Sequence, residues 1–307
     1  MQRHADRLHL SPSDVTAYLA CEHLTTLSLR AARGEIETPA LEDEQRELVF
    51  RKGLEHERAY LETLRAEGKS VVESDTDDRD WEAAERRTRE ALATGVDVVY
   101  QGVFAQDGWR GQADFLLRRE DGVYEALDTK LARTAKPAYI LQLLFYDEQL
   151  ARIQGPAERE IHVLLGSGER ATYRPAEFAA YYRRVRSRLE RFVADPPPTE
   201  PYPNDHCPLC DFRPLCEDWW ERTDHLSRVA GLYRTQIEKL AAAGITTLGQ
   251  LGRAPAEPAP AGMSAETWAK LREQAELQLR RRETGVDEYR LLPLQAEAGF
   301  ALLPEPS

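Results

Sequence analysis

The sequence predicts an α/β fold, because the spacing of its hydrophobic residues changes twice along the chain. Apolar residues recur with a helical period in three stretches up to position 93, and from 96 to 130 they alternate with a period of two. An amphipathic stretch at 136–155 and the buried run EIHVLLGSG follow. The resulting order of helices, antiparallel meander, helix and strand is typical of an α/β core.

Three helices are expected before the meander. The first starts near Ser11, whose side chain can cap a helix, and runs to Gly34 with Cys21 on or beside it. The second spans about 42–67 and the third 80–93. Each carries an apolar stripe at helical spacing, so each has one face to bury.

The meander is expected to contain three strands, because two Asp-Gly pairs, at 107–108 and 121–122, divide it. Asp-Gly is favoured in the tight turns of β-hairpins. Beyond the core, a helix at 175–194 leads into the Pro-rich connector PPPTEPYPND, which is expected to lie on the surface.

The C-terminal part is expected to be helical. Two short helices joined at Gly244 are followed by a Pro- and Ala-rich linker at 254–262 and by a helix from about 265 to 282. The final run LLPLQAEAGFALLPEPS shows no evident fold of its own.

Composition excludes several classes of protein. A chain of 307 residues with 42% hydrophobic side chains can bury a sizeable core, so it is not disordered. The most apolar run, at 138–146, is far shorter than the roughly 20 residues that a membrane span needs, and the N-terminus lacks the apolar region of a signal peptide. We therefore expect a cytoplasmic protein without a membrane partner, whose four cysteines form no disulfides.

The formal net charge of -12 argues, taken alone, against a nucleic-acid partner. Basic residues nevertheless gather in RRVRSRLERF at 183–192 and in RRR at 280–282. A positive groove can therefore exist on a negative protein.

Two carboxylates in the meander are candidates for a metal site. Asp114 ends the sequence GQAD on one strand, and Asp128 with Lys130 forms DTK at the end of the next strand. On adjacent antiparallel strands the two carboxylates can approach each other and hold Mg²⁺ or Mn²⁺. Lys130, two residues after Asp128, lies on the same strand face, where an ammonium can stabilise a charged transition state. The alternative is an exposed ion pair, but the apolar neighbours of Asp128 make that costly.

Other polar residues allow two interpretations. His56 lies on the second helix, and a lone helical histidine is more often structural than a ligand. Its neighbours Glu55 and Glu57 are expected to point to other faces. Gln142 and Tyr146 share one helix face at i, i+4 spacing, where they can bind a phosphate or base or form the polar edge of a core stripe.

The cysteines predict a metal centre. Cys207, Cys210 and Cys216 form C-x2-C-x5-C directly after the Pro-rich connector, and Cys21 is the only candidate for a fourth thiolate. Structural zinc and an iron-sulfur cluster both accept four thiolates, and spacing alone modestly favours zinc.

Together these motifs resemble the RecB-like nucleases of the PD-(D/E)XK superfamily over roughly residues 11 to 220. The iron-sulfur branch, with the CRISPR-associated four-cysteine exonucleases and the nuclease domains of the AddB type, is the more similar. The motifs occur in the order of the family, namely His56, GQAD ending at Asp114, DTK with Asp128 and Lys130, Q-x3-Y with Gln142 and Tyr146, and the split cysteines. One departure is that Asp114 does not follow a proline.

The resemblance implies a restriction-endonuclease-like core, a mixed central sheet flanked by helices, with an iron-sulfur subdomain and a helical C-terminal extension. It implies that Asp114 and Asp128 bind Mg²⁺ or Mn²⁺ with His56 as a further ligand, and that Lys130 is the catalytic lysine. It also implies DNA contacts for Gln142 and Tyr146. The residues Cys21, Cys207, Cys210 and Cys216 would hold a 4Fe-4S cluster.

The segment GITTLGQL resembles the linker helices of RecB-like nucleases that continue into a ribonuclease-H-like domain and often a helicase. We therefore expect a nuclease domain at 1–225 and a helical extension at 226–307, with such a partner domain in the same or another chain.

The favoured function is a Mg²⁺- or Mn²⁺-dependent deoxyribonuclease, an exonuclease on single-stranded DNA or DNA ends with a structural 4Fe-4S cluster. One alternative is a non-catalytic DNA-binding module with an architectural cluster, although the complete set of two aspartates and a lysine counts against it. A redox protein is less well supported, because no G-x-G-x-x-G follows a strand.

Overall fold

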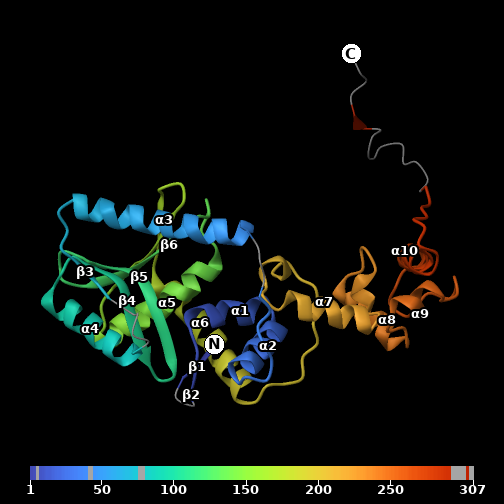
Figure 1. Cartoon of the computed structure of the whole chain (residues 1–307), viewed down its shortest axis with the longest axis horizontal. Helices are drawn as coiled ribbons and strands as arrows, with labels where there is room; N and C mark the ends of the chain where they lie inside the picture. Colours follow the sequence, from blue (N-terminus) through green and yellow to red (C-terminus); the bar gives the residue numbers. More distant parts are fainter. Residues whose placement is uncertain (5–6, 41–43, 75–79, 292–301, 304–307) are drawn as a thin grey trace. The chain divides into compact units, whose positions relative to one another are not determined.

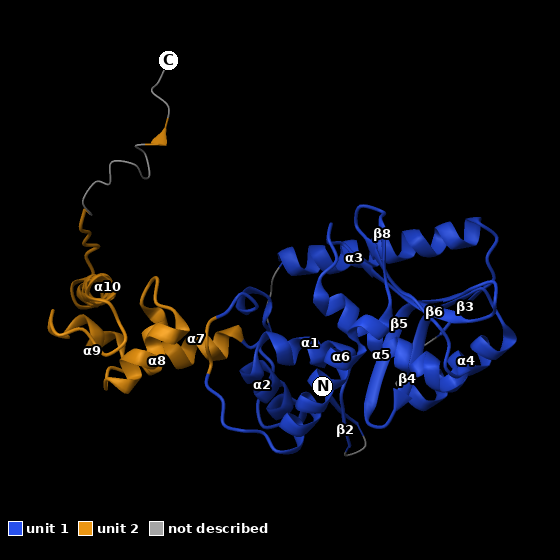
Figure 2. Cartoon of the chain, turned by 180° about the vertical axis from the view of Figure 1, so that it is seen from behind, with its two compact units in different colours: residues 1–200, 204–212 blue, residues 201–203, 213–307 orange. Residues whose placement is uncertain are grey.

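The computed structural model of the chain describes residues 1–4, 7–40, 44–74, 80–291 and 302–303. The chain divides into two compact units, one made of 1–200 and 204–212 and the other of 201–203 and 213–307 (Figure 2). The division falls before position 225 because helix α7 (Arg213–Arg222) contacts the short helix η2 (Leu226–Arg228) of the second unit.

A six-stranded mixed sheet forms the centre of the first unit. Its strands, in spatial order, are β3 (Val71–Glu73), β4 (Val98–Gln106), β5 (Trp109–Arg118), β6 (Tyr124–Lys130), β7 (Ile161–Leu165) and β8 (Arg170–Tyr173). The pairs β3–β4 and β6–β7 are parallel, and the other neighbours are antiparallel. The expected meander and its two Asp-Gly turns are confirmed, with Asp107 and Gly122 at positive φ.

Helices cover both faces of the sheet (Figure 1). Helix α3 (Glu44–Ala66) packs Leu61 and Leu64 against the face that carries Phe115 and Leu127. The other face is covered by α1 (Pro12–Ala20), α4 (Trp81–Thr94), α5 (Pro137–Gln154) and α6 (Pro175–Ala194), which contribute to a second, larger apolar cluster. The predicted α/β core, a mixed central sheet flanked by helices, is confirmed.

The expectation of one continuous helix from Ser11 to Gly34 is wrong. Cys21 has extended backbone angles, φ -163° and ψ 112°, which end α1 and begin α2 (Glu22–Ala32). The Leu24 amide donates to Cys21 Sγ at 3.4 Å, so the thiol takes the place that an oxygen usually fills at a helix start. A hairpin of β1 (Gln2–His4) and β2 (Arg7–His9) precedes these helices, and the sequence did not predict it.

The side-chain alternation of the central hairpin changes phase in its middle. On β5, Ala113 belongs to the larger cluster, whereas Phe115, two residues later, belongs to the cluster under α3. In the register of β4 and β5, Gln101 stands opposite Asp114, and Gln101 has a φ of 57°, in the left-handed region. A residue in this conformation interrupts the pleat, so the faces exchange at the level of Asp114.

The second unit is helical around its own apolar cluster. The expected short helices are α8 (Arg234–Ala242) and α9 (Leu248–Gly252), joined at Gly244 with a φ of 81°, and the long helix is α10 (Ala265–Thr284). The short helix η1 (Cys207–Leu209), in the first unit, was not expected. Most of the C-terminal run and the start of the expected helix at 42 lie outside the described residues. In the described part of the chain, no helix combines the length and apolarity that a membrane crossing requires.

We expect Gly166→Ala to destabilise the first unit by about 1–3 kcal/mol, as overpacking of a close contact does. A Cβ at Gly166 would lie closer to the Leu131 carbonyl group than Cβ atoms come to other atoms in real proteins. The Leu131 carbonyl is backbone, so it cannot move aside as a flexible side chain can. Urea unfolding of both proteins measures the change. Gly53→Ala is the control, since a Cβ there meets nothing within 4 Å and Ala favours a helix; a loss as large as that of Gly166→Ala would contradict the explanation.

Candidate active site

The two predicted aspartates meet at the end of the central strands. Phe115 pairs with Leu127, so the register places Asp114 beside Asp128 on the neighbouring strand. The Thr129 amide and hydroxyl donate to Asp114 Oδ2 at 2.8 and 2.9 Å. One oxygen of Asp114 is therefore fixed by the backbone of β6, and the other is left for a ligand.

Asp128 is a buried carboxylate beside charges of both signs. Its residue is 6% exposed, and burial followed by the nearby Asp114 raises its pKa well above the usual range. Lys130 Nζ lies 2.5 Å from Asp128 Oδ2 and 5.4 Å from the centre of the Tyr139 ring. Burial by itself would lower the pKa of Lys130, but Asp128 and Asp114 raise it, so the side chain stays an ammonium.

These residues fit a hard divalent cation. The Lys130 ammonium lies 2.5 Å from the buried Asp128 Oδ2, and Asp114 lies close enough to raise the pKa of Asp128. Two neighbouring carboxyl groups carry more negative charge than one ammonium offsets, which favours a bound cation. Mg²⁺ and Mn²⁺ prefer carboxylate oxygens and water, so Asp114 and Asp128 would hold such an ion.

Glu57 is a site residue that the sequence analysis missed. It was expected to point away, but it is 7% exposed and accepts a short hydrogen bond from Gln101 Nε2. Burial, followed by the charge of Asp114, raises its pKa, so the two carboxyl groups face the same region. The spacing contained the signal, since Glu57, Leu61 and Leu64 occupy one helical stripe at i, i+4 and i+7.

The side chain of His56 reaches the sheet, where it faces a backbone carbonyl group. Its Nε2 lies 3.5 Å from the carbonyl oxygen of Leu164, and Leu164 pairs with Thr129 in the parallel register of β6 and β7. The histidine thus stands next to the strand that carries Asp128 and Lys130. When Nε2 carries the proton and donates a hydrogen bond to the Leu164 carbonyl, the lone pair of Nδ1 is left to bind a metal.

Gln142 and Tyr146 differ in exposure although they share a helix face. Gln142 is half-buried, whereas Tyr146 is 7% exposed and donates its hydroxyl to the Gln112 carbonyl at 2.6 Å. Gln112 Nε2 in turn lies 3.5 Å from the carbonyl oxygen of Gln101. Contact of Gln142 and Tyr146 with DNA stays a prediction; the structure shows that Tyr146 also braces the hairpin beside Asp114.

Three of the four cysteines come together in the first unit. Burial raises the pKa of Cys210, and the sulfurs of Cys21 and Cys207 raise it further, which shows that the three groups are near one another. Backbone amides donate to Cys21 Sγ from Leu24 and to Cys207 Sγ from Asn204 at 3.3 Å. No disulfide joins the four, and Cys216 lies on α7 in the second unit.

A different acidic group lies at the opposite ends of β6 and β7. Glu125, Glu160 and His162 offer ligand atoms that all lie within 4.8 Å of one another. Glu125 and His162 are already engaged, because His162 Nε2 lies 3.0 Å from Glu125 Oε2 and Arg119 donates to Glu125 Oε1 at 3.0 Å. Burial opposes ionisation of Glu125, but hydrogen bonds from His162, the Glu160 amide and Arg119 lower its pKa to about 2.

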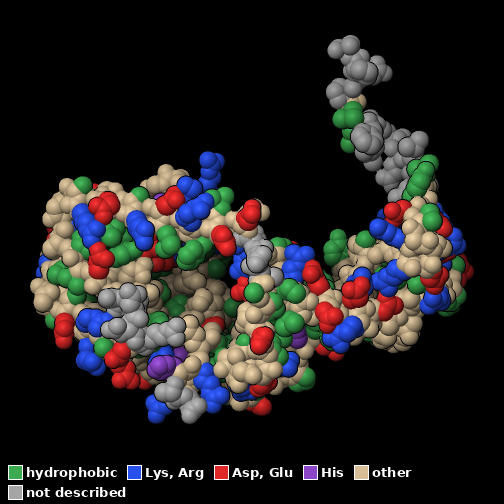
Figure 3. All heavy atoms as spheres, in the orientation of Figure 1, with side chains coloured by type: hydrophobic (Ala, Val, Ile, Leu, Met, Phe, Trp, Pro, Cys, Tyr) green, Lys and Arg blue, Asp and Glu red, His purple; other side chains and the backbone are tan. Residues whose placement is uncertain are grey.

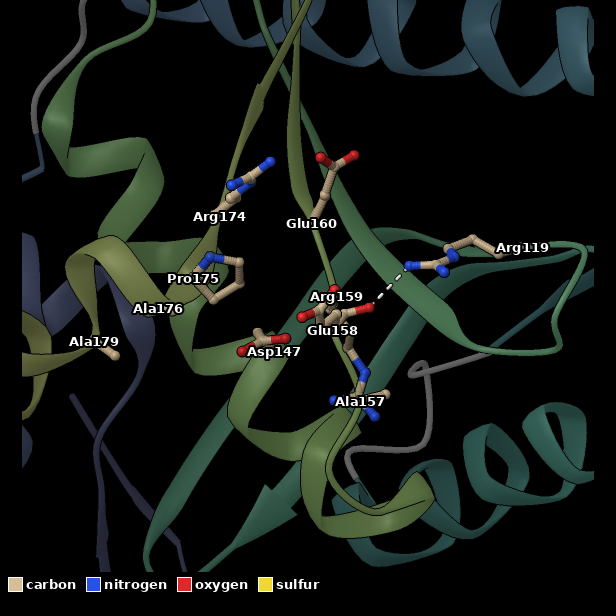
Figure 4. Close-up of a pocket in the computed structure, with 10 residues that line it drawn as sticks. All are labelled: Arg119, Asp147, Ala157, Glu158, Arg159, Glu160, Arg174, Pro175, Ala176 and Ala179. Atoms are coloured by element: carbon tan, nitrogen blue, oxygen red, sulfur yellow. Dashed lines mark hydrogen bonds between the residues drawn. The ribbon is translucent and has the colours of Figure 1, made fainter.

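A cavity of about 650 Å³ adjoins this group (Figure 4). Three arginines and three acidic residues line it, and Arg119 donates to the Glu158 carbonyl at 2.8 Å. In Figure 4, Arg159 turns away from Arg174, and its Nη2 donates to the Gly155 carbonyl at 2.8 Å. The guanidinium groups do not converge on one point, so the cavity shows no anion site.

Two carboxylates and a lysine beside one another on a mixed sheet are an arrangement that suits hydrolytic enzymes acting through divalent cations. A family model described as the PD-(D/E)XK nuclease superfamily matches residues 9–217, about two thirds of the chain. The chain therefore belongs to the PD-(D/E)XK nuclease superfamily, in which metal-dependent cleavage of nucleic acid is the common activity.

Other comparisons add little. No curated protein matches the sequence. Among solved structures, the crystal structure of SSO0001 is similar over 64% of this chain and 95% of that chain, with 14% sequence identity and a TM-score of 0.26. A likeness of this size carries no argument about fold or function.

Removal of the Glu125 charge should destabilise the fold in a pH-dependent way. The pKa of Glu125 is lowered from 4.5 to about 2, so its carboxylate stabilises the folded state above about pH 4.5, and this contribution is lost as the pH falls towards 2. We expect the difference in unfolding free energy between wild type and Glu125→Gln to be full at pH 7 and to shrink below pH 4.5.

Urea unfolding of both proteins at pH 7, 5, 4 and 3 measures this difference. Asp121→Asn is the matched control, because Asp121 also pairs with Arg119 but is half-exposed and contributes little. A difference that stays constant down to pH 3 would show that the Glu125 charge does not stabilise the fold.

Proposed function

We propose that the protein is a deoxyribonuclease that hydrolyses phosphodiester bonds with Mg²⁺ or Mn²⁺. The observation that carries the proposal is the meeting of Asp114 and Asp128 at one strand end, with Lys130 Nζ 2.5 Å from Asp128 Oδ2. When bound, the cation supplies a Lewis acid and lowers the pKa of a coordinated water.

The residues of the chain then have separate tasks. Asp114, held by Thr129, and Asp128 bind the cation, with His56 as a further ligand by resemblance. Lys130 stays charged, so its task is to orient the attacking water and to offset the negative charge that develops on the phosphate.

We further propose, on the resemblance, that the enzyme is an exonuclease of the RecB-like iron-sulfur branch and acts on single strands or DNA ends, which Gln142 and Tyr146 help to bind. The resemblance of GITTLGQL supports a ribonuclease-H-like domain or a helicase as partner of the extension at 226–307. These proposals rest on the order of the motifs.

We propose a structural 4Fe-4S cluster on Cys21, Cys207, Cys210 and Cys216. The first three sulfurs lie near one another, and backbone amides donate to each of them, which offsets part of the burial and mutual repulsion that oppose a thiolate before a metal binds. Hydrogen bonds to the sulfurs are also among the features that tune iron-sulfur clusters.

Loss of any one of Asp114, Asp128 and Lys130 should abolish cleavage. We expect Asp114→Ala, Asp128→Ala and Lys130→Ala to lose at least about 100-fold in rate, the effect of removing a group that stabilises transition-state charge. Cleavage of labelled single-stranded DNA with Mn²⁺ measures the rates. Undiminished cleavage by purified Asp128→Ala would refute the assignment.

The control for this series is the folded state. Removing a carboxylate relieves repulsion, but Asp128→Ala leaves the Lys130 ammonium without its partner and Asp114→Ala leaves the Thr129 donors unpaired, so the melting temperature of each variant must show that it is folded. If a variant is inactive because it is unfolded, its loss of cleavage says nothing about catalysis. Asp128→Asn keeps the side-chain volume of Asp128, so loss of cleavage in folded Asp128→Asn would assign the effect to the missing charge.

Removal of the Cys21 thiolate should cost the protein its cluster. The anaerobically purified wild type should be brown and contain about four iron atoms per chain, and Cys21→Ala and Cys21→Ser should be pale. Iron analysis and the absorption spectrum measure this. A colourless wild type with one zinc per chain would identify a zinc site instead.

Cys21→Ser separates the two tasks of Cys21. The serine oxygen still accepts the Leu24 amide and caps α2, so only Cys21→Ala also loses the cap, at about 1 kcal/mol. Equal iron in Cys21→Ser and wild type would show that Cys21 is not a ligand.

A further inference from the structure

We propose that the first half of α3 is a binding surface for single-stranded nucleic acid, on which Phe50 stacks an unpaired base. The inference deepens the proposed nuclease function and rests on it. We call the residues Val49, Phe50 and Gly53 the α3 apolar surface.

This surface is the exposed continuation of a buried stripe on the same helix. Glu57, Leu61 and Leu64 are the buried residues of α3, and the same stripe runs back through Gly53 to Phe50. Phe50 is 70% exposed, and a Cβ at Gly53 would meet nothing within 4 Å. The face that packs on the sheet in the second half of the helix is therefore uncovered in the first half.

The surface is apolar and lies close to the site. Val49 is 56% exposed and precedes Gly53 by four residues, so it lies beside Phe50 on the same side of the helix. Phe50 precedes Glu57 by two helical turns, about 10 Å along the axis. In Figure 3, hydrophobic, basic and acidic side chains lie side by side along α3, on a unit whose surface is hollowed below this helix.

Two exposed cations follow Lys130 along the chain. The sixteen residues from Leu131 to Tyr146, directly after Lys130, contain no acidic residue. Arg133 and Lys136 are exposed, and neither side chain has a partner among the described residues; both lie within about 20 Å of Lys130 even if the chain is fully extended. On a protein of net charge -12, such a segment suits a phosphate backbone.

An unpaired strand fits these features better than a duplex or a protein does. Base faces are free to stack on an aromatic ring only where the bases are unpaired, and stacking does not require a particular sequence. A protein partner would need roughly 800 Å² of accessible surface on each side with an apolar centre, and the exposed side chains of Val49 and Phe50 form only a small one.

Fluorescence anisotropy tests the proposal on the whole protein, with labelled oligo(dT) and a blunt hairpin duplex in EDTA so that no cleavage occurs. We expect Phe50→Ala to weaken binding of oligo(dT) about tenfold, within the range that loss of one base stack gives, and Phe50→Tyr to bind within about twofold of wild type. Binding of the duplex should not change.

The matched control is Tyr181→Ala, because Tyr181 on α6 is also an exposed aromatic residue, at 55%. Its affinity for oligo(dT) should equal that of wild type. Both substituted side chains lie at the surface, so melting temperatures should stay unchanged and confirm that each variant is folded.

Three results would overturn the proposal, namely no binding of oligo(dT) by wild type, equal binding by wild type and Phe50→Ala, or an equal loss for oligo(dT) and duplex. A change in sedimentation without a change in binding would assign the surface to a second copy of the chain and overturn it as well. Cleavage with Mn²⁺ is scored separately, so Phe50-dependent binding without cleavage would refute the nuclease and leave the surface standing.

Discussion

The close approach of two like charges, Asp114 and Asp128, is the constraint on which the rest of the site depends. The buried Asp128 and the half-buried Asp114 repel each other, and either a proton on one of them or a positive charge beside them makes their shared position stable. Lys130 supplies one such charge in the folded chain. The proposed affinity of this site for a divalent ion would follow from the same repulsion between the two carboxyl groups.

The fold holds this arrangement through backbone groups and a few short contacts of neighbouring side chains. Thr129, between Asp128 and Lys130, fixes Asp114 with its amide and hydroxyl. Gly166 lets the chain leave β6 directly against the end of β7, where the Gly166 amide donates to the Ala132 carbonyl at 3.1 Å. Helix α3 then brings Glu57 over the same strand end from the other layer.

The parts of the structure that follow from local chemistry could be predicted from the sequence, and those that depend on distant packing could not. Asp-Gly turns and a period of two defined the meander, and its register placed Asp114 beside Asp128. The strands β3 and β8 were too short to show a period. The break at Cys21 had no local signal, and the charge of Glu57 concealed its place on a buried stripe.

Gln101 affects both the stability of the sheet, through its backbone conformation, and the candidate site, through its side chain. Its left-handed backbone costs on the order of 1 kcal/mol for a residue other than glycine, yet its side chain holds Glu57 and its kink turns the sheet at Asp114. Glycine would relieve the strain and release Glu57. The replacement that would raise the stability of the first unit would therefore loosen a carboxyl group of the candidate site.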